Sequence, residues 1–167
     1  NQGADVFFSP VSIEAAGLII EQASTQGMAI PILAGDTWDS NVVLAAAKDT
    51  NVKIYVTTFF VEGSQEPQVL EFVDGFRNYI NTNATAKTNN GGNDEISAVS
   101  AMGFDAYYVA LEALKAAGST KGADVQTALP GVSYTGVSGL IEIDEIGDAK
   151  RDVPYLKQVN NETGHRH

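Results

Sequence analysis

A carboxylate and the only tryptophan of the chain come directly after a short apolar run, at positions 36–38. Residues 30–35 form that run, and Asp36, Thr37 and Trp38 follow it. A free amino acid presents an ammonium group, which needs an acceptor carboxylate, and a carboxylate, which needs N–H or hydroxyl donors. Asp36 supplies such an acceptor, so the segment is a candidate binding site if the strand ends at an open edge.

Catalytic chemistry has little support in the sequence. The chain has no cysteine, and its two histidines stand together at positions 165 and 167. Neither a thiolate nucleophile nor a Ser-His-Asp relay is therefore indicated. Glycine patterns that cradle phosphates are missing as well. We expect a protein that is not an enzyme and that has no cofactor and no metal site, with a small flavodoxin-like enzyme as the least favoured alternative.

The overall composition excludes further classes of partner. The 167 residues carry a formal net charge of -11, and 44% of them are hydrophobic. Nucleic acid binding needs clustered Lys and Arg, so we expect no nucleic acid partner. No apolar run approaches the roughly 20 residues of a membrane span. The chain starts with Asn1 instead of Met, so we expect any export signal or lipoprotein anchor to lie upstream of it.

The first half alternates between predicted strands and helices. Three apolar runs predict strands, at residues 5–9, 30–35 and 52–60. Helical spacing of apolar residues predicts helices that begin after the capping residues Ser12 and Ser40. This alternation indicates an α/β fold with a parallel sheet flanked by helices, covered on both faces.

In such a sheet, ligands bind outside the carboxyl ends of the strands. Ser9, Asp36 and Phe59 stand at the ends of the three predicted strands. We therefore expect these three residues to converge on one edge, where a cleft would form.

The second half has a different pattern. Helices are predicted at residues 67–80, 97–117 and 124–129, and strands at residues 141–143 and 155–159. The polar stretch at residues 81–94 predicts a surface loop, and Asp105 is expected to form hydrogen bonds within its own helix. Three parallel strands make a small sheet, which suggests that the chain alone is incomplete.

Four stretches share the residue patterns and the order of one known family. They are DVFF at 5–8 with EQA at 21–23, PILAGDTWDS at 31–40, FDAY at 104–107 with ALKAAGS at 113–119, and YTGVSG at 134–139 with IDEIGD at 143–148. With these motifs the chain resembles the C-terminal half of a type I periplasmic solute-binding protein, of the Leu/Ile/Val-binding or receptor ligand-binding group.

The resemblance implies a two-lobed, hinged (Venus flytrap) fold about twice as long as this chain. Residues 1–61 would be part of the C-terminal lobe, residues 62–149 a segment returning to the N-terminal lobe, and residues 150–167 the crossover back and a tail. It implies an extracytoplasmic, periplasmic or cell-surface receptor of an ABC transporter. Such a receptor binds a small amino acid or amide between its lobes and docks on a membrane permease. A ligand-sensing regulator on the same fold is the alternative, and pairing with a second copy is a further possibility.

The resemblance also implies roles for individual residues. Asp36 stands where the family places its ammonium-binding acid, although the branched-chain receptors usually have the longer Glu. Trp38, beside Thr37, would form a wall of the pocket. Ser12 stands where those receptors often have an aromatic residue. Ser9 and Phe59 are cleft residues on strand geometry alone.

Each of these residues also has a purely structural interpretation. Asp36 can be a loop carboxylate or a cap acceptor, and Trp38 can serve local packing. Ser12 is an expected N-cap of its helix, a role compatible with ligand contact because a helix N-terminus also binds carboxylates.

Overall fold

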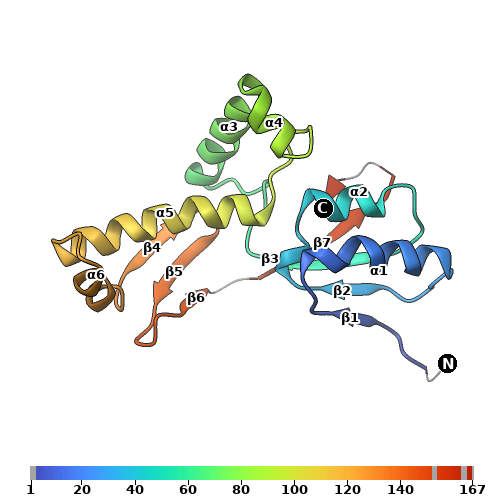
Figure 1. The fold of residues 1–167 in the computed structure, drawn as a ribbon, viewed down its shortest axis with the longest axis horizontal. Helices are drawn as coiled ribbons and strands as arrows, with labels where there is room; N and C mark the ends of the chain where they lie inside the picture. Colours follow the sequence, from blue (N-terminus) through green and yellow to red (C-terminus); the bar gives the residue numbers. More distant parts are fainter. Residues whose placement is uncertain (1–2, 152–153, 163–164, 167) are drawn as a thin grey trace.

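The computed structural model describes residues 3–151, 154–162 and 165–166 (Figure 1). Its elements are, in chain order, β1 (Phe7–Ser9), α1 (Ile13–Thr25), β2 (Ile32–Ala34), the 3₁₀ helix η1 (Asp36–Trp38), α2 (Asn41–Ala47), β3 (Ile54–Thr58), α3 (Pro67–Thr82), α4 (Ala84–Asn89), α5 (Ala98–Ala117), α6 (Gly122–Ala128), β4 (Ser133–Gly136), β5 (Gly139–Ile143), β6 (Ala149–Arg151), β7 (Tyr155–Asn160) and β8 (His165–Arg166). The strand, helix, strand, helix, strand order predicted for the first half is confirmed.

The larger sheet has the strand order β1-β2-β3-β7-β8. Strands β1, β2 and β3 are parallel, as the sequence predicts, and their register places Ser9 beside Ala34 and Ala34 beside Val56. Strand β7 then adds antiparallel to β3, with Val56 beside Lys157. Residues from the far end of the chain therefore complete a sheet that the first residues begin.

Helices α1 and α2 pack on one face of this sheet and not on both faces, which corrects the prediction (Figure 1). Alternate strand residues such as Ile32 and Ile54 join the buried core with α1 and α2, because successive side chains of a strand point to opposite faces. On the opposite face Phe8 and Leu156 are each 61% exposed. Local periodicity shows that a strand is buried on one side, but it does not show what covers the other.

The second sheet is an antiparallel meander, β4-β5-β6, beside the long helix α5. Ser97 caps α5 by accepting a hydrogen bond from the Ser100 N–H at 3.2 Å, and Gly118 ends it with a left-handed φ of 58°. The predicted loop at residues 81–94 contains helix α4, whose N-cap Asn83 accepts a hydrogen bond from Ala86 N–H at 2.9 Å. The polar composition concealed this helix, because α4 has no buried residue to create a periodic signal.

Figure 1 shows the two sheets in separate parts of the molecule, side by side. One part holds β1–β3, β7 and β8, and the other holds α3–α6 and β4–β6. The chain passes between the parts after β3 and again before β7. The lobe boundaries at residues 61 and 149 stay a prediction, and residues 152–153, 163–164 and 167 of the final segment lie outside the described residues.

Candidate functional site

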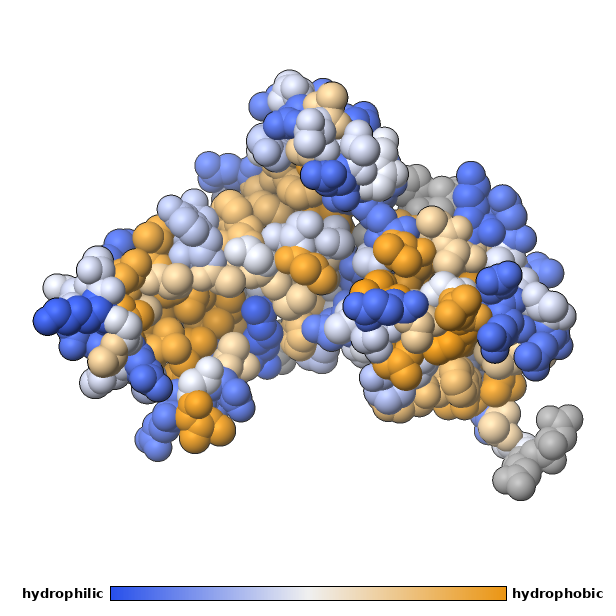
Figure 2. Space-filling view, viewed as in Figure 1, coloured by the Kyte–Doolittle hydropathy of each residue, from blue (hydrophilic) through white to orange (hydrophobic). Residues whose placement is uncertain are grey.

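The carboxyl ends of β1, β2 and β3 lie at the same edge of the larger sheet. The register brings Ser9, Ala34 and Val56 level with one another, so the residues that follow, including Asp36 and Phe59, come off this edge together. In Figure 1 this edge faces the second part of the molecule. Figure 2 shows that the molecular surface is indented between the two parts.

Asp36 is the first residue of η1, directly after β2 and Gly35. Its side chain is half-buried, and it forms no hydrogen bond or ion pair with any residue that the structure describes. It is therefore neither a cap acceptor nor the partner of a loop N–H. A carboxylate with unused acceptor capacity at this edge can receive an ammonium group.

Trp38 favours the packing alternative. Its side chain is 0% exposed and belongs to the core cluster of α1, α2 and the sheet. Its indole Nε1–H donates to the Val11 carbonyl at 3.0 Å, which ties η1 to the segment before α1. The neighbouring Thr37 is exposed. Of these two neighbours, solvent therefore reaches Thr37 and does not reach Trp38.

The two serines near α1 occupy different surroundings. Ser9 is only 2% exposed, and its hydroxyl has no hydrogen-bond partner among the described residues. Ser12 is exposed and has an extended backbone at the N-cap position, but its side chain makes no capping hydrogen bond. Its hydroxyl instead bonds to Glu14, and this hydrogen bond lowers the pKa of the Glu14 carboxyl below its ordinary value. The predicted side-chain cap is thus replaced by a local side-chain pair.

A buried ion pair that the sequence did not predict joins Asp39, directly after η1, to Lys157 of β7. Asp39 is 0% exposed, and its Oδ2 accepts hydrogen bonds from Thr58 Oγ1 at 2.5 Å and from Lys157 Nζ at 3.0 Å. The Lys157 ammonium also lies 5.6 Å from the centre of the Phe60 ring. The signal was present, since Lys157 occupies an inward position in an alternating strand, but its partner is 118 residues away.

A second unpredicted network lies where the two parts meet. Arg151 donates from Nη1 to the Ser138 hydroxyl at 2.5 Å, and its guanidinium carbon lies 5.2 Å from the centre of the Phe59 ring. Ser138 in turn donates to the carboxylate of Asp105. Phe59, a predicted site residue, is therefore covered in part by a cation from the second part of the molecule.

Asp105 forms its hydrogen bonds far from its own helix, contrary to the prediction. It is 0% exposed and accepts from the N–H groups of Val137 and Ser138, both at 2.8 Å, and from the Ser138 hydroxyl at 2.5 Å. Gly136 is required here, because a Cβ at that position would sit 2.2 Å from Asp105 Oδ1. The FDAY and YTGVSG motifs thus meet at one buried carboxylate.

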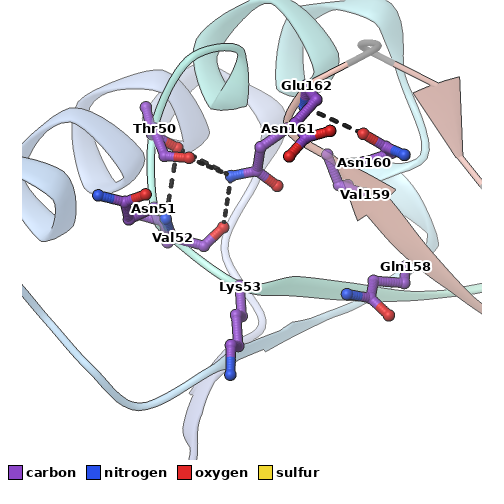
Figure 3. Close-up of a pocket in the computed structure, with 9 residues that line it drawn as sticks. All are labelled: Thr50, Asn51, Val52, Lys53, Gln158, Val159, Asn160, Asn161 and Glu162. Carbon is purple, nitrogen blue, oxygen red and sulfur yellow. Dashed lines mark hydrogen bonds between the residues drawn. The ribbon is translucent and has the colours of Figure 1, made fainter.

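Figure 3 shows a cavity at the opposite end of β3, lined by residues 50–53 and 158–162. Its volume is about 470 Å³. The Asn161 amide donates to Thr50 O at 2.9 Å, to Thr50 Oγ1 at 3.0 Å and to Val52 O at 2.9 Å. The Asn161 amide and its acceptors on Thr50 and Val52 are therefore hydrogen-bonded to one another, and they lie at the amino end of β3. The cavity therefore does not coincide with the candidate site.

Two further observations concern the described residues as a set. They contain no cluster of His, Asp or Glu side chains that could hold a metal ion. Within the same residues, no helix combines the length and apolar character that a membrane span needs.

Comparisons with known proteins agree on one family. Residues 1–162 match the family model described as periplasmic binding protein. Among solved structures, a leucine-binding protein from Thermotoga maritima is 26% identical with a TM-score of 0.72, over 98% of this chain and 43% of that one. No curated protein matches the chain.

Two more distant structures support the fold alone. The branched-chain amino acid transporter substrate-binding protein of Streptococcus pneumoniae, in complex with isoleucine, is 20% identical with a TM-score of 0.71, over 99% of this chain and 44% of that one. A solute-binding protein from R. palustris, in complex with benzoate, is 18% identical with a TM-score of 0.72, over 98% of this chain and 41% of that one. The chain therefore spans less than half the length of these relatives.

Proposed function

Since the chain belongs to the periplasmic binding protein family, we propose that it is the part of an ABC transporter's solute receptor that binds a small amino acid or amide. Its ligand would bind at the carboxyl edge of the larger sheet, in the space between the two parts of the molecule. The receptor would act outside the cytoplasm and deliver the ligand to a permease in the membrane. Ligand binding would favour a closed arrangement of the parts, to the extent that the closed form binds more tightly.

The observation that carries this proposal is the Asp36 carboxylate. It stands half-buried at the sheet edge and is not engaged by any described residue. A carboxylate removed from part of its hydration gains from an ammonium partner, and charge-assisted hydrogen bonds of this kind are the stronger ones. Thr37, the next residue of η1, and Ser12, at the N-cap of α1, are exposed and would add hydroxyl groups.

The likeness to the leucine-binding protein supports an amino acid as the ligand and leaves its side chain open. The similar structures are a leucine-binding protein and two solute-binding proteins in complex with isoleucine and with benzoate. These ligands belong to those proteins. The shorter reach of Asp36 compared with Glu would draw a ligand closer to the sheet edge or leave room for water.

Calorimetric titration of the purified protein with the standard L-amino acids tests the proposal. At least one of them should release or absorb heat with a saturable profile. Asp36→Asn should weaken that binding roughly 10- to 100-fold, because it removes a charged hydrogen-bond partner. The unfolding temperature should stay unchanged, because the carboxylate makes no described contact.

Asp74→Asn is the matched control, since Asp74 is an exposed carboxylate on α3, away from the sheet edge. It should leave the affinity unaltered. A protein that binds none of the amino acids, or an Asp36→Asn variant with wild-type affinity, would refute the proposal.

A further inference from the structure

We infer that the chain forms a dimer through β1, which pairs with β1 of a second copy so that the two larger sheets join across a two-fold axis. The contact lies along residues 6–8, called the β1 edge below. The inference does not depend on the ligand. It rests on an edge strand that has nothing to prevent pairing, and on the symmetry that such a strand allows.

The outer side of β1 is open. Strand β1 forms one border of the larger sheet (Figure 1), and among the described residues it pairs only with β2. The Phe7 N–H donates to the Pro31 carbonyl at 2.8 Å, so the backbone groups of Phe7 are directed at β2. Successive residues of a strand direct these groups to opposite sides. The N–H and C=O groups of Val6 and Phe8 therefore point outward, where no described strand receives them.

The side chains of the β1 edge are apolar and exposed. Val6 is 47% exposed, Phe7 41% and Phe8 61%, and none of them carries a charge. Edge strands usually avoid pairing by means of charged side chains, prolines or bulges. The nearest charge and the nearest proline, Asp5 and Pro10, stand outside the edge. The β1 edge thus keeps both the backbone groups and the apolar surface that pairing needs.

Three observations select a second copy as the partner. The undescribed residues come at most two in a row, so no undescribed segment of this chain is as long as β1. The other border of the sheet, β8, is only two residues long, which disfavours head-to-tail pairing of β1 with β8. A two-fold axis places the same short segment opposite itself, and because the β1 edge is uncharged, no like charges meet there.

The direction of the backbone groups sets the register. In an antiparallel pair the outward groups form the hydrogen-bonded positions, so Val6 of one copy lies opposite Phe8 of the other. Each such pair joins a β-branched and an aromatic side chain, a favourable cross-strand combination. The two Phe7 residues then face each other with about 4.5 Å between their Cα atoms. An axis moved to Phe8 would instead bring Pro10, which has no N–H, opposite Val6.

Analytical ultracentrifugation at about 1 to 100 μM protein tests the association. The wild type should change from monomer to dimer in this range. Added salt should favour the dimer, because each copy carries a net charge of -11. Phe8→Lys should stay monomeric, since an edge lysine opposes pairing. The control is Leu18→Lys, which has the same net charge and alters a residue of α1 that is also 61% exposed; it should associate as the wild type does.

A single introduced thiol tests the register. The chain has no cysteine, so Phe7→Cys has one thiol per copy. Cα atoms about 4.5 Å apart lie within the range that a disulfide spans. Under mild oxidation, Phe7→Cys should form a linked dimer roughly 10-fold faster than Leu18→Cys or more, because pairing raises the effective concentration of the second thiol.

A wild type that stays monomeric at every concentration overturns the inference. An unchanged dimer in Phe8→Lys overturns it as well, and so does Phe7→Cys that is linked no faster than Leu18→Cys. Leu156→Lys separates the edge from the uncovered face of the sheet, where Leu156 is 61% exposed. This variant should still associate, and a dimer that only Leu156→Lys abolishes would assign the contact to that face. If circular dichroism shows that Phe8→Lys does not fold, the disulfide rates decide.

Discussion

Replacement of Asp105 by alanine should destabilise the protein strongly, although the residue contacts no candidate site residue directly. Its carboxylate is 0% exposed and accepts hydrogen bonds from Val137 N–H, Ser138 N–H and the Ser138 hydroxyl. The alanine variant leaves these donors without an acceptor in a site that water does not reach. Hydrogen bonds to a charged group contribute about 1.5–3 kcal/mol each, and partial relaxation of the turn recovers some of that.

We therefore expect the free energy of unfolding to fall by about 3–5 kcal/mol, in the range of other broken buried charge networks. For a chain of this length, each kcal/mol shifts the unfolding temperature by about 2–4 °C, so the loss is roughly 6–20 °C. Differential scanning calorimetry measures it, with Asp74→Ala on the exposed face of α3 as the control. A shift below about 2 °C would refute the assignment of Asp105 as the anchor of the β4–β5 turn.

Two further predictions concern other buried or half-buried groups. Lys157→Met should lower the free energy of unfolding by about 3–5 kcal/mol, because it leaves the fully buried Asp39 carboxylate without the Lys157 ammonium. Urea unfolding measures this loss. The double variant Lys157→Met, Asp39→Asn should recover part of it, because the buried carboxylate charge is then removed as well. Burial, assisted by the negative charge of Asp105, raises the pKa of Tyr134 above its ordinary value of 10.0. The folded state then holds the Tyr134 proton more tightly than the unfolded state, so stability should fall as the pH rises above 10.0. Tyr134→Phe should remove this contribution to the pH dependence, which urea unfolding below and above pH 10.0 measures.

Much of the fold could be predicted from the sequence because its signals are local. Alternating apolar residues identified β3 and β5, and Pro67 and Gly118 marked helix ends by their restricted or permissive backbone. The order of strands and helices then indicated a parallel sheet, and the pairing of β1, β2 and β3 agrees.

The features that the sequence could not supply are non-local. The partner of Asp39 is 118 residues away and the donors to Asp105 are 32 and 33 residues away, so neither pairing follows from spacing along one element. Which faces of the sheet the helices cover likewise depends on how the chain turns between elements. At the candidate site, residue types singled out Asp36, but Arg151 was missed because no periodic pattern links the end of β6 to the end of β3.

The antiparallel pairing of β3 with β7 governs the order in which the larger sheet can assemble. Tyr55 lies beside Gln158, so nearly the whole chain must be available before this central pair of strands forms. Contacts between residues so distant in sequence close slowly, because the entropy of the intervening loop is lost before the contact contributes. The Asp39–Lys157 ion pair cannot form before β7 joins the sheet. The strands of the second sheet all lie within residues 133–151, so that sheet can fold first.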